Sequence, residues 1–168
     1  MEAVVRTFKQ LWRLANGFKI WNMGDHIVLF VFDNNSDVER IIQNQPWSFD
    51  KHLVVLQKFD EFSKFNELVF DKAWLWVQVY DIPIHFMSKK VAESICEIIG
   101  EVQRSPESTN DDGGKFIRVC VLIDITLPLC RGRVITLENG EKSWVQFQYE
   151  RLPNKCYWCG HLNHDNNI

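Results

Sequence analysis

Apolar residues recur at helical spacing over residues 2–15, with basic and amide side chains on the opposite side, and predict an amphipathic helix over this range that Asn16-Gly17 terminates. Two strand-like runs follow, over residues 18–23 and 26–32. The Gly24-Asp25 pair between them favours a tight turn, so the two runs predict a β-hairpin. The apolar positions of the helix are Val4, Phe8, Leu11 and Ala15.

A second helix and a third strand complete this N-terminal pattern. Residues 36–43 carry an apolar stripe, and Ser36 and Glu39 have the spacing of a capping box at its start. Pro46 closes the helix, and residues 52–58 predict a strand. The order α-β-β-α-β matches the ferredoxin-like plan of RNA-recognition domains without its first strand. Either a strand of the second half replaces the missing one, or the chain is an N-terminally shortened copy.

The second half of the chain predicts strands and one helix in the order β-α-β-β-β, mostly antiparallel. Residues 73–80 place aromatic or polar side chains on one face and aliphatic ones on the other, as expected of a strand with one buried face. Asn139-Gly140 is a strong hairpin signal between the last two strands. Residues 105–114 are polar and predict a loop. The other predicted elements are a helix over 88–99 and strands over 116–126, 134–137 and 144–149, and residues 101–104 are a candidate for one further short strand.

Charge and cysteine content narrow the classes of function. The net charge of −3 argues against a strongly electrostatic nucleic-acid binder. The charge is uneven, because residues 1–112 carry 12 basic and 17 acidic side chains whereas residues 113–168 carry 7 basic and 5 acidic ones. The five cysteines have no framework spacing, and we find neither a membrane-spanning apolar run nor a signal-peptide pattern. We therefore expect an intracellular protein, nuclear or cytoplasmic, without a membrane partner.

The last fourteen residues carry the clearest chemical motif. Cys156, Cys159 and His164 have the C-x2-C-x4-H spacing in which two thiolates and an imidazole reach one zinc ion, and Gly160 permits the turn between them. The fourth ligand of a full C-x2-C-x4-H-x4-C knuckle would stand one position after Ile168. We therefore expect weak zinc binding, or else a frayed tail with two free thiols. The candidates for the fourth position are water, Asp165 and His161.

Aromatic and basic residues around this motif are candidates for nucleic-acid contacts. Tyr157 and Trp158 stand in a loop too small to bury both rings, which makes them candidates for stacking on bases. Five basic residues near them are candidates for phosphate contacts, with solvated surface charge as the alternative. They are Arg131, Arg133, Lys142, Arg151 and Lys155.

Sequence blocks spread over almost the whole chain carry a resemblance to one family. The most specific block joins residues 149–153 (YERLP) to residues 156–160 (CYWCG). With these blocks the chain resembles the plant domain of unknown function that precedes a C-x2-C-x4-H-x4-C zinc knuckle in proteins related to LINE-type retrotransposons. The other blocks are residues 45–49 (QPWSF), 76–83 (WVQVYDIP), 99–100 (IG), 123–125 (IDI) and 128–129 (PL).

The resemblance implies nucleic-acid binding, with zinc held by Cys156, Cys159 and His164. Three features depart from the family pattern: the fourth-ligand cysteine, the leading strand, and Asn163 at a position where the family usually has glycine. Asn adopts left-handed backbone angles nearly as well as glycine does. The losses at both ends indicate a fragment, a gene-model truncation or a decaying copy.

Taken together, these patterns predict an α+β protein in three parts. A ferredoxin-like, or RRM-like, module without its first strand spans residues 1–62. A second α+β module spans residues 63–153, and a truncated CCHC-type zinc knuckle spans residues 154–168. We expect weak and largely sequence-independent binding of single-stranded RNA or DNA.

Several aromatic residues admit either a binding role or a packing role. Phe30 and Phe32 share one face of their strand, as stacking rings would, but the basic residue and glycines of an RNA-binding strand are missing. Trp74, Trp76 and Tyr80 also share a face, where they form a base-stacking platform, cover a helix or fill an interface between the two halves. We favour packing for both groups.

The rival function is a protein-interaction or assembly module that self-associates through aromatic surfaces and keeps a vestigial knuckle. Salt discriminates between the two, because nucleic-acid binding weakens steeply with salt and an apolar interface does not. The sequence has no phosphate-binding glycine loop, no His-Glu-x-x-His motif and no Asp-Ser/Thr-Gly motif. We therefore expect that the protein is not an enzyme.

Overall fold

The computed structural model describes residues 1–59, 62, 64–104, 114–153 and 160–162. The chain divides into two compact units, residues 1–45 and 46–168. Helices and antiparallel strands occur in the same chain, which confirms the predicted α+β class. Within the described ranges, no helix has the length and apolar character that a membrane crossing requires. The three predicted parts remain a prediction, and the predicted polar loop lies outside the described residues except for Gly114.

The first unit has the four elements that the sequence predicts, with a shorter first helix. Helix α1 ends at Trp12 because Arg13 adopts left-handed backbone angles, with φ 47° and ψ 49°. The predicted end of the helix at Ala15, before Asn16-Gly17, is therefore wrong. The elements are α1 (Glu2–Trp12), β1 (Lys19–Gly24), β2 (Ile27–Val31) and α2 (Asn35–Gln43).

Helix α2 is capped by Asn34 rather than by Ser36. Asn34 has extended backbone angles, and its side-chain oxygen accepts a hydrogen bond from the Ser36 backbone N–H at 2.9 Å. The capping box predicted at Ser36 and Glu39 is wrong, because the helix begins one residue earlier and Ser36 already lies inside its first turn.

Aromatic side chains form the interior of the first unit. Phe8 and Trp12 of α1 are only 1% and 4% exposed. The Trp12 ring lies 4.9 Å from the Phe30 ring and 5.7 Å from the Phe32 ring, and Phe18 completes the cluster. The packing role predicted for Phe30 and Phe32 is confirmed.

The second unit opens with a small hairpin. The strand predicted over residues 52–58 is only three residues long, because pairing stops at Val54. Its partner was not predicted, since a run of three residues gives no period to detect. The ferredoxin-like plan stays a prediction. The two strands are β3 (Trp47–Phe49) and β4 (His52–Val54).

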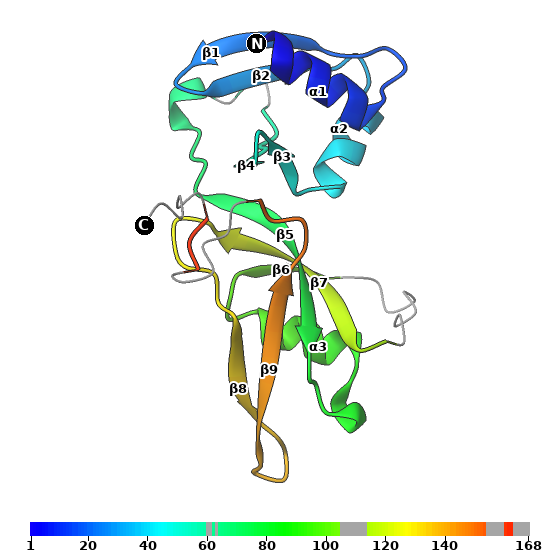
Figure 1. Cartoon of the computed structure of the whole chain (residues 1–168), viewed down its shortest axis with the longest axis vertical. Helices are drawn as coiled ribbons and strands as arrows, with labels where there is room; N and C mark the ends of the chain where they lie inside the picture. Colours follow the sequence, from blue (N-terminus) through cyan, green and yellow to red (C-terminus); the bar gives the residue numbers. More distant parts are fainter. Residues whose placement is uncertain (60–61, 63, 105–113, 154–159, 163–168) are drawn as a thin grey trace. The chain divides into compact units, whose positions relative to one another are not determined.

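A five-stranded antiparallel sheet dominates the second unit, in the order β6-β7-β5-β9-β8. The succession is β-α-β-β-β-β rather than the predicted β-α-β-β-β, because the short strand expected over residues 101–104 is present as β6. β8 and β9 run side by side as the predicted hairpin (Figure 1). Two short 3-10 helices, Phe65–Glu67 and Ile84–Phe86, flank β5 in sequence. The elements are β5 (Lys72–Tyr80), α3 (Lys89–Cys96), β6 (Glu101–Gln103), β7 (Phe116–Asp124), β8 (Gly132–Thr136) and β9 (Lys142–Tyr149).

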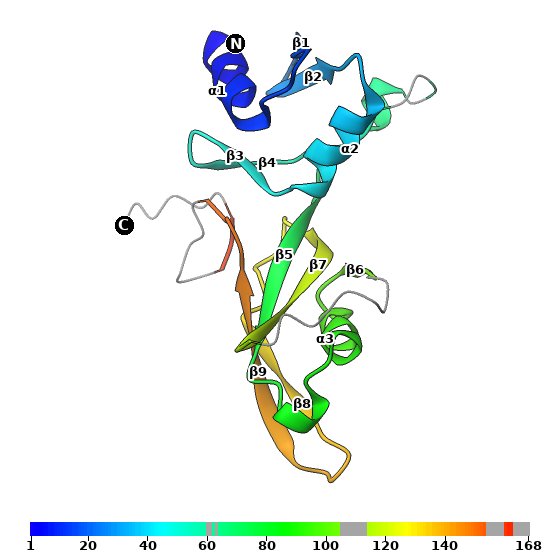
Figure 2. The ribbon, with the colours of Figure 1, turned by 90° about the vertical axis from the view of Figure 1, so that its right-hand side faces the viewer.

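The core of this unit lies between the sheet and helix α3, which covers one sheet face (Figure 2). Buried and half-buried residues alternate along β5, as the sequence pattern predicts. Ser88 caps α3 by accepting a hydrogen bond from the Val91 N–H. The fully buried sheet residues include Leu75, Val77, Val79, Val119, Val121 and Val145.

The close packing of Gly100 against β7 generates a prediction about stability. A Cβ atom at this position would collide with the carbonyl oxygen of Leu122 on β7, and a backbone atom cannot rotate away. We expect Gly100→Ala to destabilise the chain by about 3 kcal/mol through overpacking. Urea unfolding followed by tryptophan fluorescence measures the loss.

Gly140 supplies the matched control for this substitution. Nothing lies within 4 Å of a Cβ built there, and only its left-handed φ of 81° opposes a side chain. Gly140→Ala should therefore cost about 1 kcal/mol. Equal losses in the two variants would contradict the collision at Gly100.

Candidate zinc and nucleic-acid site

Three residues of the predicted knuckle, Gly160, His161 and Leu162, belong to the described part of the chain. The other predicted site residues of this segment lie outside it, so their ligand and stacking roles stay predictions. They are Lys155, Cys156, Tyr157, Trp158, Cys159 and His164.

Gly160 turns the chain directly after the second predicted cysteine ligand. Its φ is +80°, in the left-handed region that favours glycine. Its carbonyl oxygen accepts a hydrogen bond from the Leu129 N–H at 3.0 Å, and a Cβ atom would lie 3.3 Å from the Leu129 oxygen. This geometry fits a zinc knuckle, because the turn after a C-x-x-C pair redirects the chain toward the third ligand.

Leu162 anchors the same segment in the second unit. It is 8% exposed and belongs to the main hydrophobic core, together with Leu129 at 4%. Between Gly160 and Leu162, His161 is half-buried. Residues 160–162, which stand in sequence between the predicted ligands Cys159 and His164, therefore pack against the sheet unit.

The residues that receive this segment are tied to strand β9. The Tyr149 hydroxyl donates to the Cys130 carbonyl at 2.6 Å, and the Phe147 N–H donates to the Arg131 carbonyl at 2.8 Å. Burial raises the pKa of Tyr149 far above its usual value, so this hydroxyl remains a donor at neutral pH. Residues Leu129–Gly132 connect β9 to Gly160, and we call this segment the strap.

The predicted phosphate-contacting residues divide between the two ends of the β8–β9 hairpin. Arg131 and Arg151 are exposed at the end near the strap. Lys142 pairs with Thr136 at the turn end of β9, about 20 Å further along at 3.3 Å per residue. Arg133 is half-buried, and its Nε makes no hydrogen bond among the described residues.

A side-chain network on the sheet face opposite α3 was not predicted. Arg118 donates two hydrogen bonds to the Glu150 carboxylate, at 2.7 and 2.8 Å, and its guanidinium lies 4.4 Å above the Trp76 ring. Gln78 donates to the same carboxylate, and the Tyr80 hydroxyl donates to Gln78. The cross-strand pairing of Gln78 with Arg118 creates this network, and sequence alone does not give that register.

Two of the three aromatic residues predicted to share a face of β5, Trp76 and Tyr80, pack against side chains of β7. The Trp76 ring carries the Arg118 guanidinium, and the Tyr80 ring lies 5.0 Å from the Phe116 ring. Packing was predicted for both rings and is confirmed, although their partners come from β7 rather than from a helix or an interface.

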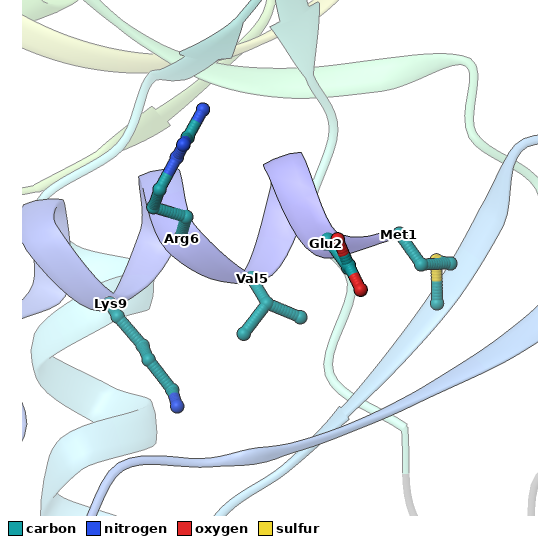
Figure 3. Close-up of a pocket in the computed structure, with 5 residues that line it drawn as sticks. All are labelled: Met1, Glu2, Val5, Arg6 and Lys9. Atoms are coloured by element: carbon teal, nitrogen blue, oxygen red, sulfur yellow. The ribbon is translucent and has the colours of Figure 1, made fainter.

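Of the three cysteine thiols among the described residues, Cys96 and Cys120 are buried and Cys130 is half-buried. Burial raises the pKa of the Cys96 thiol to about 12 and that of Cys120 to about 11. Among the described residues, no three His, Cys, Asp or Glu side chains gather to hold a metal ion. A surface hollow at α1 has a mixed lining of two cations, one carboxylate and two apolar side chains, and the Arg6 side chain points away from those of Val5 and Lys9 (Figure 3). Its lining residues are Met1, Glu2, Val5, Arg6 and Lys9.

Two known protein families match this chain, one at each end. Residues 1–67 match a family described as a domain of unknown function, DUF4283, and residues 123–168 match a family described as a zinc knuckle. The zinc-knuckle match includes the strap and the β8–β9 hairpin as well as the C-x2-C-x4-H segment. No solved structure matches the chain.

A plant relative is similar over most of the chain. The uncharacterized protein At4g02000 of Arabidopsis thaliana is 27% identical over 133 residues, which cover 78% of this chain and 41% of the relative. The chain thus spans less than half the length of that protein. The predicted resemblance is confirmed for the domain of unknown function, for the zinc knuckle and for a plant homologue.

Glu150 generates a pH-dependent prediction. The hydrogen bond from Arg118 is the largest cause that lowers the pKa of this carboxyl below 4.5. Because the folded state lowers this pKa, the stabilisation is present above pH 4.5 and is lost as the pH falls through the folded-state pKa. Glu150→Gln should cost about 1 kcal/mol at pH 7, since Arg118 is partly exposed, and much less near pH 3.

Urea unfolding at the two pH values measures this difference. Glu101→Gln, which changes an exposed carboxylate on edge strand β6, is the matched control and should cost little at either pH. A Glu150→Gln loss that stays constant between pH 7 and pH 3 would contradict the ion pair.

Proposed function

We propose that this chain binds zinc and single-stranded RNA or DNA through its C-terminal knuckle, with little sequence preference and without catalysis. The observation that carries the proposal is the zinc-knuckle match over residues 123–168, which contains the C-x2-C-x4-H spacing. The left-handed turn at Gly160 supports it, because a knuckle needs this turn after its second cysteine.

The proposed roles follow from side-chain chemistry. Cys156, Cys159 and His164 hold zinc, which fixes the short loop between them. Tyr157 and Trp158 stack on bases, and such stacking tolerates any sequence because every base has a π-face.

Basic residues near the strap contact phosphates in this proposal. Arg131 and Arg151 are exposed at the strap end of the hairpin, and Lys155 follows in sequence. Lys142 lies at the far end and Arg133 is half-buried, so they extend the surface rather than complete one cluster. The excess of basic over acidic residues after residue 112 is small, so the affinity is modest and depends on salt.

We also infer that the chain derives from a LINE-type retrotransposon protein. The resemblance of the sequence blocks to that family supports this origin, and the family matches and the Arabidopsis relative support the domain and the zinc knuckle. A binding role without catalysis is consistent with the raised pKa values of Cys96 and Cys120, which leave both thiols protonated and unreactive at neutral pH.

A second candidate function is self-assembly, and one observation favours it. Trp21 and Val31 share the face of the β1–β2 hairpin opposite the aromatic cluster, and they are 60% and 39% exposed. Exposed aromatic and aliphatic side chains on one sheet face are typical of a protein-binding surface. Sedimentation of the chain and of Trp21→Ser tests this candidate, since assembly through this face would be lost in the variant.

Binding of fluorescent single-stranded RNA, followed by anisotropy at low salt with and without a zinc chelator, tests the first function. We expect the chelator and Cys159→Ser to weaken binding about tenfold, and Trp158→Ala to cost roughly 1–3 kcal/mol through lost stacking. Cys130→Ser is the control, because its hydroxyl can still donate to the Gly132 carbonyl as the thiol does. Binding insensitive to chelation would locate the activity outside the knuckle, and no binding would contradict the proposed function.

Salt and an added ligand sharpen the same experiment. Three to four phosphate contacts should give a slope of about −2 to −3 in a plot of log affinity against log salt for a single strand. A cysteine appended directly after Ile168 completes the C-x2-C-x4-H-x4-C spacing and should strengthen zinc binding by at least about tenfold, since structural zinc is four-coordinate. Isothermal titration with zinc measures that change, and an unchanged affinity would contradict the predicted ligand set.

A further inference from the structure

Leu162 occupies an unusual place for a residue of a zinc knuckle. In sequence it stands three residues after Cys159 and two before His164, yet its side chain is 8% exposed in the main core of the sheet unit. A leucine in a C-terminal tail that did not pack on the sheet would not be buried in this core. Its burial therefore joins the core of the sheet to the segment between two predicted metal ligands.

Backbone contacts fix the same segment. The Gly160 carbonyl accepts the Leu129 N–H, Gly160 itself is buried, and Leu162 takes part in an isolated β-bridge. Ordering one residue of backbone costs about 1–2 kcal/mol of conformational entropy. The contacts with the folded sheet offset part of that cost for Gly160, His161 and Leu162.

The strap transmits this attachment to the sheet. Its Leu129 contacts Gly160, while its Cys130 and Arg131 carbonyls accept hydrogen bonds from Tyr149 and Phe147 of β9. β9 in turn pairs with β5, the central strand. An unbroken series of backbone hydrogen bonds and buried side chains thus runs from the middle of the sheet to the knuckle segment.

We propose that Leu162 is a positioning residue that seats the knuckle on the sheet, so that zinc binding and folding of the five-stranded sheet stabilise each other. The inference rests on the proposed zinc ligands, Cys156, Cys159 and His164. A metal ion that binds only the folded state must stabilise that state, and this coupling between metal binding and folding is reciprocal. The attachment of the knuckle to the sheet through Leu162, which we call the seat, therefore predicts two measurable effects.

The first effect is on metal affinity. Titration of the whole chain with Co²⁺, read by the thiolate charge-transfer and d–d absorption bands, reports the ligand set directly. We expect Leu162→Ala to weaken Co²⁺ binding about tenfold although it alters no ligand. Leu162→Met, which restores an apolar side chain of similar volume, should recover most of the affinity.

The second effect is on the sheet. Zinc should raise the thermal midpoint of the wild-type chain, followed by far-ultraviolet circular dichroism, and the rise should be largely lost in Leu162→Ala. Ile95→Ala is the matched control, because Ile95 is also 8% exposed in the same core but lies on α3. It should lower the melting temperature while keeping both the zinc-induced rise and the Co²⁺ affinity.

The possible outcomes distinguish a failure of the seat from a failure of the proposed zinc binding. If the wild-type chain shows no Co²⁺ thiolate band, both the zinc site and the seat are overturned. If the band forms but zinc leaves the melting temperature unchanged, or if Ile95→Ala loses as much Co²⁺ affinity as Leu162→Ala, the seat alone is overturned. Should Leu162→Ala fail to fold, Leu162→Val provides a milder truncation, and an affinity equal to wild type would overturn the seat.

Discussion

The nine-residue antiparallel ladder between β5 and β7 is the interaction on which the second unit depends. It runs from Lys72 opposite Asp124 to Tyr80 opposite Phe116 without a break. Since strand side chains alternate, this one register buries the aliphatic residues of both strands against α3 and places Trp76, Gln78 and Arg118 together on the other face. A shift of one residue would reverse both faces. The α3 core and the Arg118–Glu150 ion pair therefore have a common origin.

The C-terminal region extends this organisation from the sheet toward the predicted metal site. β9 pairs with β5, the strap bonds to β9, and Gly160 bonds to the strap. Each step adds a backbone hydrogen bond beside a buried apolar side chain. The zinc-knuckle match begins at Ile123, well before the cysteines, which agrees with a unit that includes the hairpin and the strap as well as the metal-binding loop.

Sequence periodicity predicted most of this fold because the long elements are strongly patterned. The alternation in 73–80, the Asn139-Gly140 turn and the helix after Ser88 were sufficient for β5, the β8–β9 hairpin and α3. Short-range chemistry misled at Arg13 and Ser36, where a left-handed residue and a competing Asn34 cap set the helix ends. The C-x2-C-x4-H spacing is local and could be found from sequence. The Arg118 network and the burial of Leu162 could not, because they depend on pairing between residues far apart in the chain.

The burial of Leu162 has a consequence for how such proteins diversify. A short metal-binding loop could be exchanged between genes only where the flanking chain tolerated any insert. Here an exchanged loop would need an apolar side chain three residues after its second cysteine, or it would leave a hole in the core to which Leu162 and Leu129 belong. The hairpin, the strap and the knuckle should therefore be inherited as one block, and recombination within that block should be selected against.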